Sequence, residues 1–176
     1  AMDNYDKSIA LSPAQSDYAL FQKAKCYGFV NRITNKINTL KELLKKHPNS
    51  SFHDDTYFEL GISYTKAGSF QTAILNYDLL VARFPKSEFL KISILNKGLI
   101  LYNLGSLNKA EGILKNLVVS YPDSSIVQQA LSTLKEISVD QDNVLQFNLW
   151  LNETNINFFS ENELEKTIFI AAEKQY

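Results

Sequence analysis

Apolar residues in the middle of the chain recur at the spacing of an amphipathic helix. Between residues 70 and 84 they stand at Phe70, Ala73, Ile74, Tyr77, Leu80, Val81 and Phe84. Steps of three and four residues place these side chains on one helical face. Pro85 ends the predicted helix, because proline cannot continue the backbone hydrogen-bond ladder. A preceding helix is predicted over residues 51–67, ending at Gly68, since glycine accepts the left-handed conformation that closes many helices.

The same two-helix pattern returns after 37 residues. This step relates Pro48 to Pro85 and Pro122, and it also relates Gly68 to Gly105. It predicts a further pair of helices over residues 87–104 and 107–121, with Ser87 as the N-cap of the first. The connections inside each pair are very short, so the paired helices are expected to be antiparallel neighbours. A weaker copy lies upstream, where Tyr27 and Ile37 precede Tyr64 and Ile74 by the same step.

Small residues mark the points where paired helices are expected to cross. Gly61 and Ala73 in one copy become Gly98 and Ala110 in the next. Glycine inside a helix costs about 1 kcal/mol relative to alanine, and close approach of two backbones is the natural compensation. A large side chain at either glycine is therefore expected to overpack the crossing and destabilise the protein.

These positions carry a family resemblance. The middle copy resembles the tetratricopeptide repeat position by position, at Tyr57, Leu60, Gly61, Tyr64, Gly68, Ala73, Tyr77 and Pro85. The next copy departs from the pattern at Lys97 and Leu101, and the first copy has Ala24 for the glycine and Lys36 for the alanine. The resemblance covers about residues 13–138. It implies an all-α fold, a right-handed superhelix (α-solenoid) of antiparallel helix pairs.

The length of the repeat suggests a subgroup within this family. Usual repeats have about 34 residues, whereas these have 37, and the extra residues follow the proline. That lengthened form resembles tetratricopeptide proteins of the bacterial envelope, including outer-membrane-assembly lipoproteins and Tol–Pal-associated coordinators. The resemblance implies a location in the periplasm or at the outer membrane, with the cytoplasm as the alternative.

The repeats divide the chain into four predicted segments. Residues 1–12 are interpreted as the end of a preceding repeat, and residues 13–139 as three repeats plus the first helix of a fourth. Residues 140–159 are interpreted as an irregular spacer with a short helix, similar to spacers in large Bacteroidetes-type proteins of this family. Residues 160–176 are predicted to form the first helix of a further repeat, opened by a capping box of Ser160 and Glu163.

Both ends are expected to present bare stacking faces that promote weak self-association. The apolar candidates for these faces are Tyr5, Ile9, Leu11, Ile168, Phe169 and Ile170.

Composition and motifs argue against catalysis, cofactors and nucleic acid. The net charge is −1. Glu42 interrupts the lysines of residues 41–46, and no such run recurs in later copies, so no basic stripe is predicted. No apolar run is long enough to insert into a membrane. The run His53-Asp54-Asp55 is a weak metal-binding candidate, but acids at a helix start are explained by the helix dipole. Cys26, the single cysteine, is interpreted as a small apolar core residue. No enzymatic motif, metal site or cofactor site is predicted.

The candidate functional surface is the groove that first helices line in tetratricopeptide superhelices. The resemblance assigns the partner-binding role to Tyr18, Phe21, Lys25, Phe58, Ile62, Thr65, Ile92, Leu95, Leu99 and Tyr102. Gly28 of the first copy stands at a further repeat position that usually faces this groove. A protein or peptide segment is the expected partner, bound by a non-catalytic scaffold. Two alternatives stay open: Phe21 and Phe58 pack between adjacent repeats, or the array is a structural spacer with no ligand of its own. The carboxylate-clamp type of groove is not expected, because Phe58 and Ile62 replace its lysine and asparagine.

Overall fold

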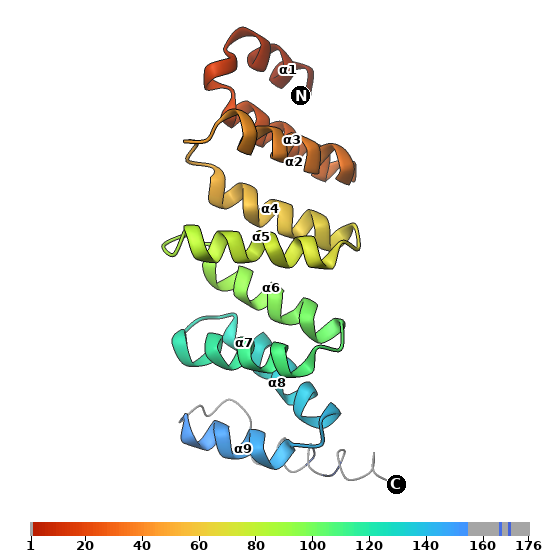
Figure 1. Cartoon of the computed structure of the whole chain (residues 1–176), viewed down its shortest axis with the longest axis vertical. Helices are drawn as coiled ribbons and strands as arrows, with labels where there is room; N and C mark the ends of the chain where they lie inside the picture. Colours follow the sequence, from red (N-terminus) through yellow and green to blue (C-terminus); the bar gives the residue numbers. More distant parts are fainter. Residues whose placement is uncertain (1, 155–165, 167–168, 170–176) are drawn as a thin grey trace. The chain divides into compact units, whose positions relative to one another are not determined.

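A computed structural model describes residues 2–154, 166 and 169 of the chain (Figure 1). This described part is all-helical and contains no strand, which confirms the predicted fold class. Its elements are α1 (Met2–Leu11), the 3₁₀ helix η1 (Pro13–Gln15), α2 (Asp17–Phe29), α3 (Ile33–Lys46), α4 (His53–Lys66), α5 (Phe70–Arg83), α6 (Leu90–Asn103), α7 (Leu107–Ser120), α8 (Val127–Asp140) and α9 (Val144–Glu153).

The helix starts after each repeat proline come later than predicted. The helix expected from residue 51 begins at His53, and the one expected from residue 87 begins at Leu90. In the second case the Ser87 hydroxyl accepts a hydrogen bond from the backbone N–H of Phe89 at 3.1 Å. The serine therefore stabilises the turn before α6, which corrects its predicted role as the cap of that helix.

The chain forms two compact units, residues 1–93 and 94–176. In the first unit α2 packs against α3, α4 packs against α5, and α3 connects the two pairs by packing against α4. Its core is formed by buried side chains from α2, α3 and α4, namely Leu20, Phe21, Ala24, Leu40, Leu43 and Leu60. In the second unit α7 packs against α8, and α8 packs against α9.

Each helical hairpin closes with the same left-handed turn. The backbone φ is +55° at Asn31, +73° at Gly68, +71° at Gly105 and +55° at Asp142, and these positions are 37 residues apart. At every turn the next residue's N–H reaches back five residues, for example from Ser69 to the Tyr64 carbonyl at 2.8 Å. This pattern is the Schellman motif, which satisfies carbonyls at a helix end.

The turn at Asp142 extends the periodic geometry into the segment interpreted as a spacer. It joins α8 to α9, and α9 packs back on α8 with Val144, Phe147 and Leu151 buried. Residues 144–153 of that segment are thus the second helix of a hairpin built like the earlier ones. Residues 155–159, Ser160, Glu163, Ile168 and Ile170 lie outside the described residues.

The two glycines do stand at helix crossings, as predicted. A Cβ placed on Gly61 would lie 2.6 Å from Cζ of Tyr77 in α5, and one on Gly98 would lie 2.5 Å from Cδ2 of Leu114 in α7. Atoms this close overlap, so a side chain at either glycine would force its neighbour in the facing helix to move. Ala73 and Ala110 are fully buried in the facing helices.

The first helix is more covered than the sequence led us to expect. Tyr5 and Ile9 are half-buried, and Ile9 packs against the core of the first unit. An ion pair between Asp6 and Lys23 also ties α1 to α2. Among the predicted bare residues at this end, Leu11 is the exposed one, at 83%.

Candidate functional site

The predicted partner-binding residues differ widely in exposure. Tyr18 is 56% exposed, whereas Phe21 and Leu95 are buried. The others are half-buried: Lys25, Phe58, Ile62, Thr65, Ile92, Leu99 and Tyr102. Phe21 and Leu95 therefore present almost no surface to a partner, which removes them from the accessible set.

Aromatic packing between helices explains the burial in the first unit. The ring of Phe21 stacks on Phe52, just before α4, with centroids 5.3 Å apart and planes 16° apart. Phe58 stacks in the same way on Phe89, at 4.6 Å and 16°. For these two residues the structure shows the alternative that the sequence left open, in which they pack between neighbouring helices.

Three of the predicted groove positions meet in one open pocket of the first unit. Lys25 and Gly28 come from α2, and Ile62 comes from α4. The pocket has a volume of about 270 Å³. Its full lining, which we call the α2–α4 pocket, is Lys25, Gly28, Phe29, Ile33, Lys36, Glu59, Ile62 and Lys66.

The wall of this pocket contains a nearly buried ion pair that sequence reasoning did not identify. The Lys36 ammonium, on α3, donates a hydrogen bond to Glu59 Oε2, on α4. The two side chains are 9% and 22% exposed. A Cβ on Gly28 would lie 3.3 Å from Lys36 Cδ, so the glycine leaves room for the lysine stem. The sequence does contain a signal for this ion pair, because Lys36 stands where the later copies have alanine, at Ala73 and Ala110.

The mouth of the pocket combines apolar and basic side chains. Phe29, at the end of α2, is 84% exposed. Lys66 lies in the last turn of α4 and is exposed, and Lys25 Nζ lies 5.8 Å from the centroid of the Phe21 ring. Three lysines thus line the pocket with one glutamate, which gives it an excess of positive charge.

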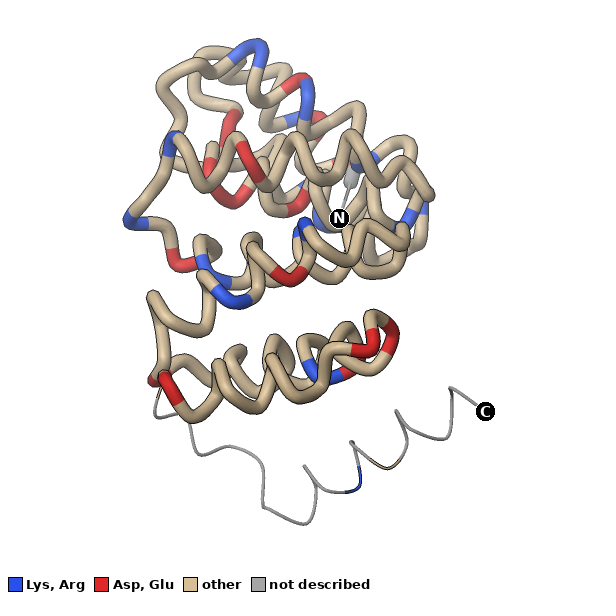
Figure 2. Tube along the Cα trace, turned by 60° about the horizontal axis from the view of Figure 1, so that its bottom comes forward, with Lys and Arg blue, Asp and Glu red and all other residues tan. Residues whose placement is uncertain are grey.

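Three carboxylates lie near one another at the start of α4: Asp54 and Asp55 in its first turn, and Glu88 in the turn before α6. Burial raises the pKa of the Asp55 carboxyl, and the neighbouring charges of Asp54 and Glu88 raise this pKa further. Lys25 opposes the shift. Figure 2 shows acidic and basic positions interspersed along the described trace, with no continuous basic stripe.

In the second unit, the predicted groove residue Tyr102 connects two first helices. Its hydroxyl, on α6, donates a hydrogen bond to Asp140 Oδ2 on α8 at 3.3 Å. Burial and the nearby carboxylates of Asp140 and Glu136 raise the pKa of this tyrosine. A larger depression of about 380 Å³ lies at the start of α7 and is lined by residues 105–109 and Gln141. It contains none of the predicted partner-binding residues.

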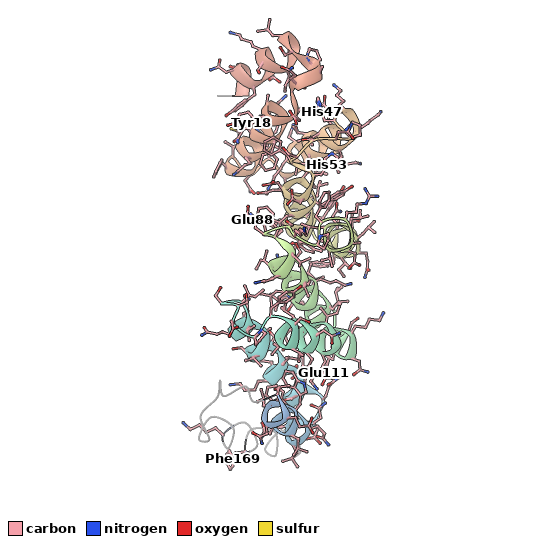
Figure 3. The ribbon with its side chains drawn as sticks, turned by 90° about the vertical axis from the view of Figure 1, so that its left-hand side faces the viewer. Tyr18, His47, His53, Glu88, Glu111 and Phe169 are labelled. Atoms are coloured by element: carbon pink, nitrogen blue, oxygen red, sulfur yellow. The ribbon has the colours of Figure 1, made fainter. Side chains whose placement is uncertain are left out.

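Both histidines, His47 and His53, form hydrogen-bond contacts with nearby residues of the first unit (Figure 3). His53 Nε2 donates to the His47 carbonyl oxygen at 2.7 Å, and His47 Nε2 lies 3.1 Å from the Ser16 hydroxyl. Within the described residues, no group of three or more His, Cys, Asp or Glu side chains is arranged to hold a metal ion. None of the described helices is long and apolar enough to cross a membrane.

Sequence comparison assigns the family. The sequence model of the tetratricopeptide repeat matches residues 18–50, 55–87 and 93–124, more than half of the chain. This chain belongs to the tetratricopeptide repeat family. The three matched stretches correspond to the three copies seen in the sequence, including the first copy with its atypical Ala24 and Lys36. Tetratricopeptide repeats generally mediate protein–protein interaction, and the family is generally non-catalytic.

Several solved structures have a similar fold. One from Parabacteroides merdae is 18% identical, with a TM-score of 0.73 over 92% of this chain and 60% of that one. MamA is 17% identical, with a TM-score of 0.68 over 99% of this chain and 86% of that one. A protein from Thermus thermophilus is 16% identical, with a TM-score of 0.53 over 98% and 89%. This chain therefore spans 60% of the length of the Parabacteroides protein. No curated protein sequence matches it significantly.

Proposed function

We propose that this tetratricopeptide repeat chain is a non-catalytic interaction scaffold whose first unit receives a segment of a protein partner at the α2–α4 pocket. The observation that carries the proposal is the meeting of Lys25, Gly28 and Ile62, three positions expected to face the groove, in one open pocket. Grooves between helices bind partner helices and extended segments through a few apolar anchors. Phe29, at the mouth of the pocket, supplies an exposed aromatic anchor.

The second candidate function is a structural spacer that holds other parts of a larger protein apart. Burial of Phe21 and Leu95 favours it, because two residues expected to contact a partner instead form the packed interior. A spacer needs no accessible pocket, so the two functions make different predictions for the α2–α4 pocket.

Peptides selected from a displayed random library against the purified chain would separate the two functions. Binding of the selected peptides should weaken by about tenfold or more in Phe29→Ser, the effect of losing an interface hot spot. Leu75→Ser is the matched control, because Leu75 is a 56% exposed apolar residue on α5 of the same unit and lies outside the pocket lining. Equal binding by both variants would contradict the α2–α4 pocket as the binding site, whereas the absence of any selected peptide would favour the spacer.

The bacterial envelope is the compartment we propose for this protein, with the cytoplasm as the alternative. The support is the 37-residue repeat, whose additional residues follow each repeat proline. This lengthened repeat resembles outer-membrane-assembly and Tol–Pal-associated proteins of the same family. Fractionation of the source cell with an antibody against this chain would test the assignment, and recovery in the cytosol would contradict it.

A further inference from the structure

We infer that the α2–α4 pocket selects an acidic side chain that stands next to a large apolar side chain in the partner segment. The inference rests on the proposed function and specifies the chemistry of the bound segment. It concerns the first copy of the repeat, because two features of the pocket change in later copies. Lys36 is replaced by Ala73 and Ala110, and Gly28 is replaced by Thr65 and Tyr102.

The charge of the pocket favours a carboxylate. Lys25, Lys36 and Lys66 line it, while Glu59 supplies the one acidic side chain of the lining. An ammonium group has three donors, and the hydrogen bond to Glu59 uses one of the three on Lys36. Its side chain is 9% exposed, so the ammonium lies where water screens charge poorly. Hydrogen bonds between ionised partners are also about twice as strong as neutral ones. A carboxylate entering this pocket would therefore meet a positively charged, partly desolvated site.

The position of Lys36 is fixed in a way that suits recognition. Its stem runs past Gly28, at a distance that would bring a Cβ on that residue to 3.3 Å from Lys36 Cδ. Glu59, on the neighbouring helix, holds the ammonium at the other end. Little side-chain entropy then remains to be lost when an anion binds, in contrast to a lysine that moves freely in solvent.

Apolar residues of the same lining favour a large apolar side chain in the partner segment. Phe29 is 84% exposed at the mouth, and Ile33 and Ile62 lie in the lining beside the lysines. Later copies place Lys66 and Asn103 at the position of Phe29, so the exposed aromatic ring is particular to this copy. A partner side chain that covers these three residues would remove apolar surface from water. A nucleic acid fits less well, because Asp54 and Asp55 stand in the first turn of α4, the helix whose last turn carries Lys66.

Two synthetic peptide pools would test the inference by amide NMR on the isotope-labelled chain. Both pools carry random flanking positions around a Phe, Leu, Ile or Trp. They differ in the preceding residue, which is Glu in one pool and Gln in the other. The Glu pool should shift the amides of Gly28, Phe29, Ile62 and Lys66 at about tenfold lower concentration than the Gln pool. Added salt should reduce this difference, because it screens the exposed part of the interaction.

Lysine variants inside and outside the pocket test whether the preference for the Glu pool arises there. Lys66→Gln and Lys25→Gln should each reduce the preference for the Glu pool several-fold. Lys45→Gln, which removes an exposed lysine of α3 outside the pocket lining, should leave the preference unchanged.

Each outcome supports or overturns the inference. Equal shifts from both pools would overturn the acidic selection while leaving the proposed scaffold function intact. If neither pool shifts the pocket amides, the inference also fails, and the display-selected peptides then decide the proposed function separately. A random-sequence DNA duplex that shifts the same amides more strongly than the Glu pool would overturn the assignment to an acidic peptide.

Discussion

Adding one methyl group at a helix crossing tests how tightly the repeat hairpins are packed. Gly61→Ala places a Cβ on α4 at 2.6 Å from Cζ of Tyr77, a distance at which the atoms overlap. Tyr77 is 1% exposed, and its planar ring cannot bend away from the contact. The helices must therefore separate or the ring must change rotamer. We expect a loss of about 3 kcal/mol in the free energy of unfolding, the upper part of the overpacking range.

The equivalent change in the next copy should cost less. A Cβ at Gly98 would lie 2.5 Å from Cδ2 and 2.8 Å from Cγ of Leu114. The clash falls mainly on the end of a flexible side chain, which can rotate, so we expect Gly98→Ala to cost about 1–2 kcal/mol. Gly112 supplies the control, because it is an exposed helical glycine with no atom within 4 Å of its Cβ position. Gly112→Ala should stabilise by about 0.5–1 kcal/mol through higher helix propensity.

Urea unfolding followed by far-UV circular dichroism would measure the three changes. The slope of the unfolding free energy against urea concentration must be the same in all variants. A changed slope would indicate that unfolding is no longer two-state, as can happen in repeat arrays. Gly61→Ala combined with Tyr77→Leu, which copies the leucine of the next repeat, should lose less than the two single changes added together. The packing argument would be refuted if Gly61→Ala cost no more than Gly98→Ala, or if Gly112→Ala were destabilising.

Three further changes probe the turns and the charges. Gly105→Ala should destabilise by about 1 kcal/mol in urea unfolding, because φ is +71° there and nothing lies within 4 Å of the added Cβ, which leaves backbone strain as the cause. Asp55→Asn should raise the urea midpoint near neutral pH, because a folded-state pKa above the unfolded value means that the ionised carboxyl destabilises the fold. The gain should shrink as pH falls through the folded-state pKa and disappear below about 4, where the unfolded state binds the proton as well. Lys36→Met should cost about 2 kcal/mol by leaving Glu59 without its charged hydrogen-bond donor, and adding Glu59→Leu should recover most of the loss in a double-mutant cycle. No pH dependence of the Asp55→Asn effect, or additive losses at Lys36 and Glu59, would contradict the respective arguments.

The hairpin architecture could be predicted because its determinants recur in the sequence. Gly68 and Gly105 mark two turns, and the predicted helices around them end within one residue of the observed ends. The fourth hairpin escaped prediction because Asp142 occupies the same left-handed position with φ of +55°. Asparagine and aspartate tolerate this conformation better than other residues with side chains, so a missing glycine does not mean a missing turn.

The residues that form the candidate site could be predicted only in part. Repeat positions pointed to Lys25 and Ile62, which do line the pocket. They also pointed to Phe21, which the structure buries against Phe52. Helical periodicity places both kinds of residue on similar faces, and the packing of one helix pair on the next decides which of them is covered. The pairing of Lys36 with a residue on the next repeat likewise depends on tertiary contact that a single-copy pattern does not contain.

Residue differences between copies of the repeat therefore fall into two kinds. One kind preserves the backbone turn, and the other introduces a new side-chain interaction. Asn31 differs in type from Gly68 but keeps a positive φ and the same turn hydrogen bonds, so this substitution preserves the architecture. Lys36 differs from Ala73 and introduces a nearly buried charge, an inter-repeat ion pair and a basic wall in an open pocket. The lysine stem that replaces alanine lies beside Gly28, where a Cβ would be 3.3 Å from Lys36 Cδ, so the two positions are closely packed. Burying a charge has a desolvation cost that the repeat architecture alone does not require. For this reason the proposed binding chemistry of the first unit is placed in the copy that departs from the repeat pattern.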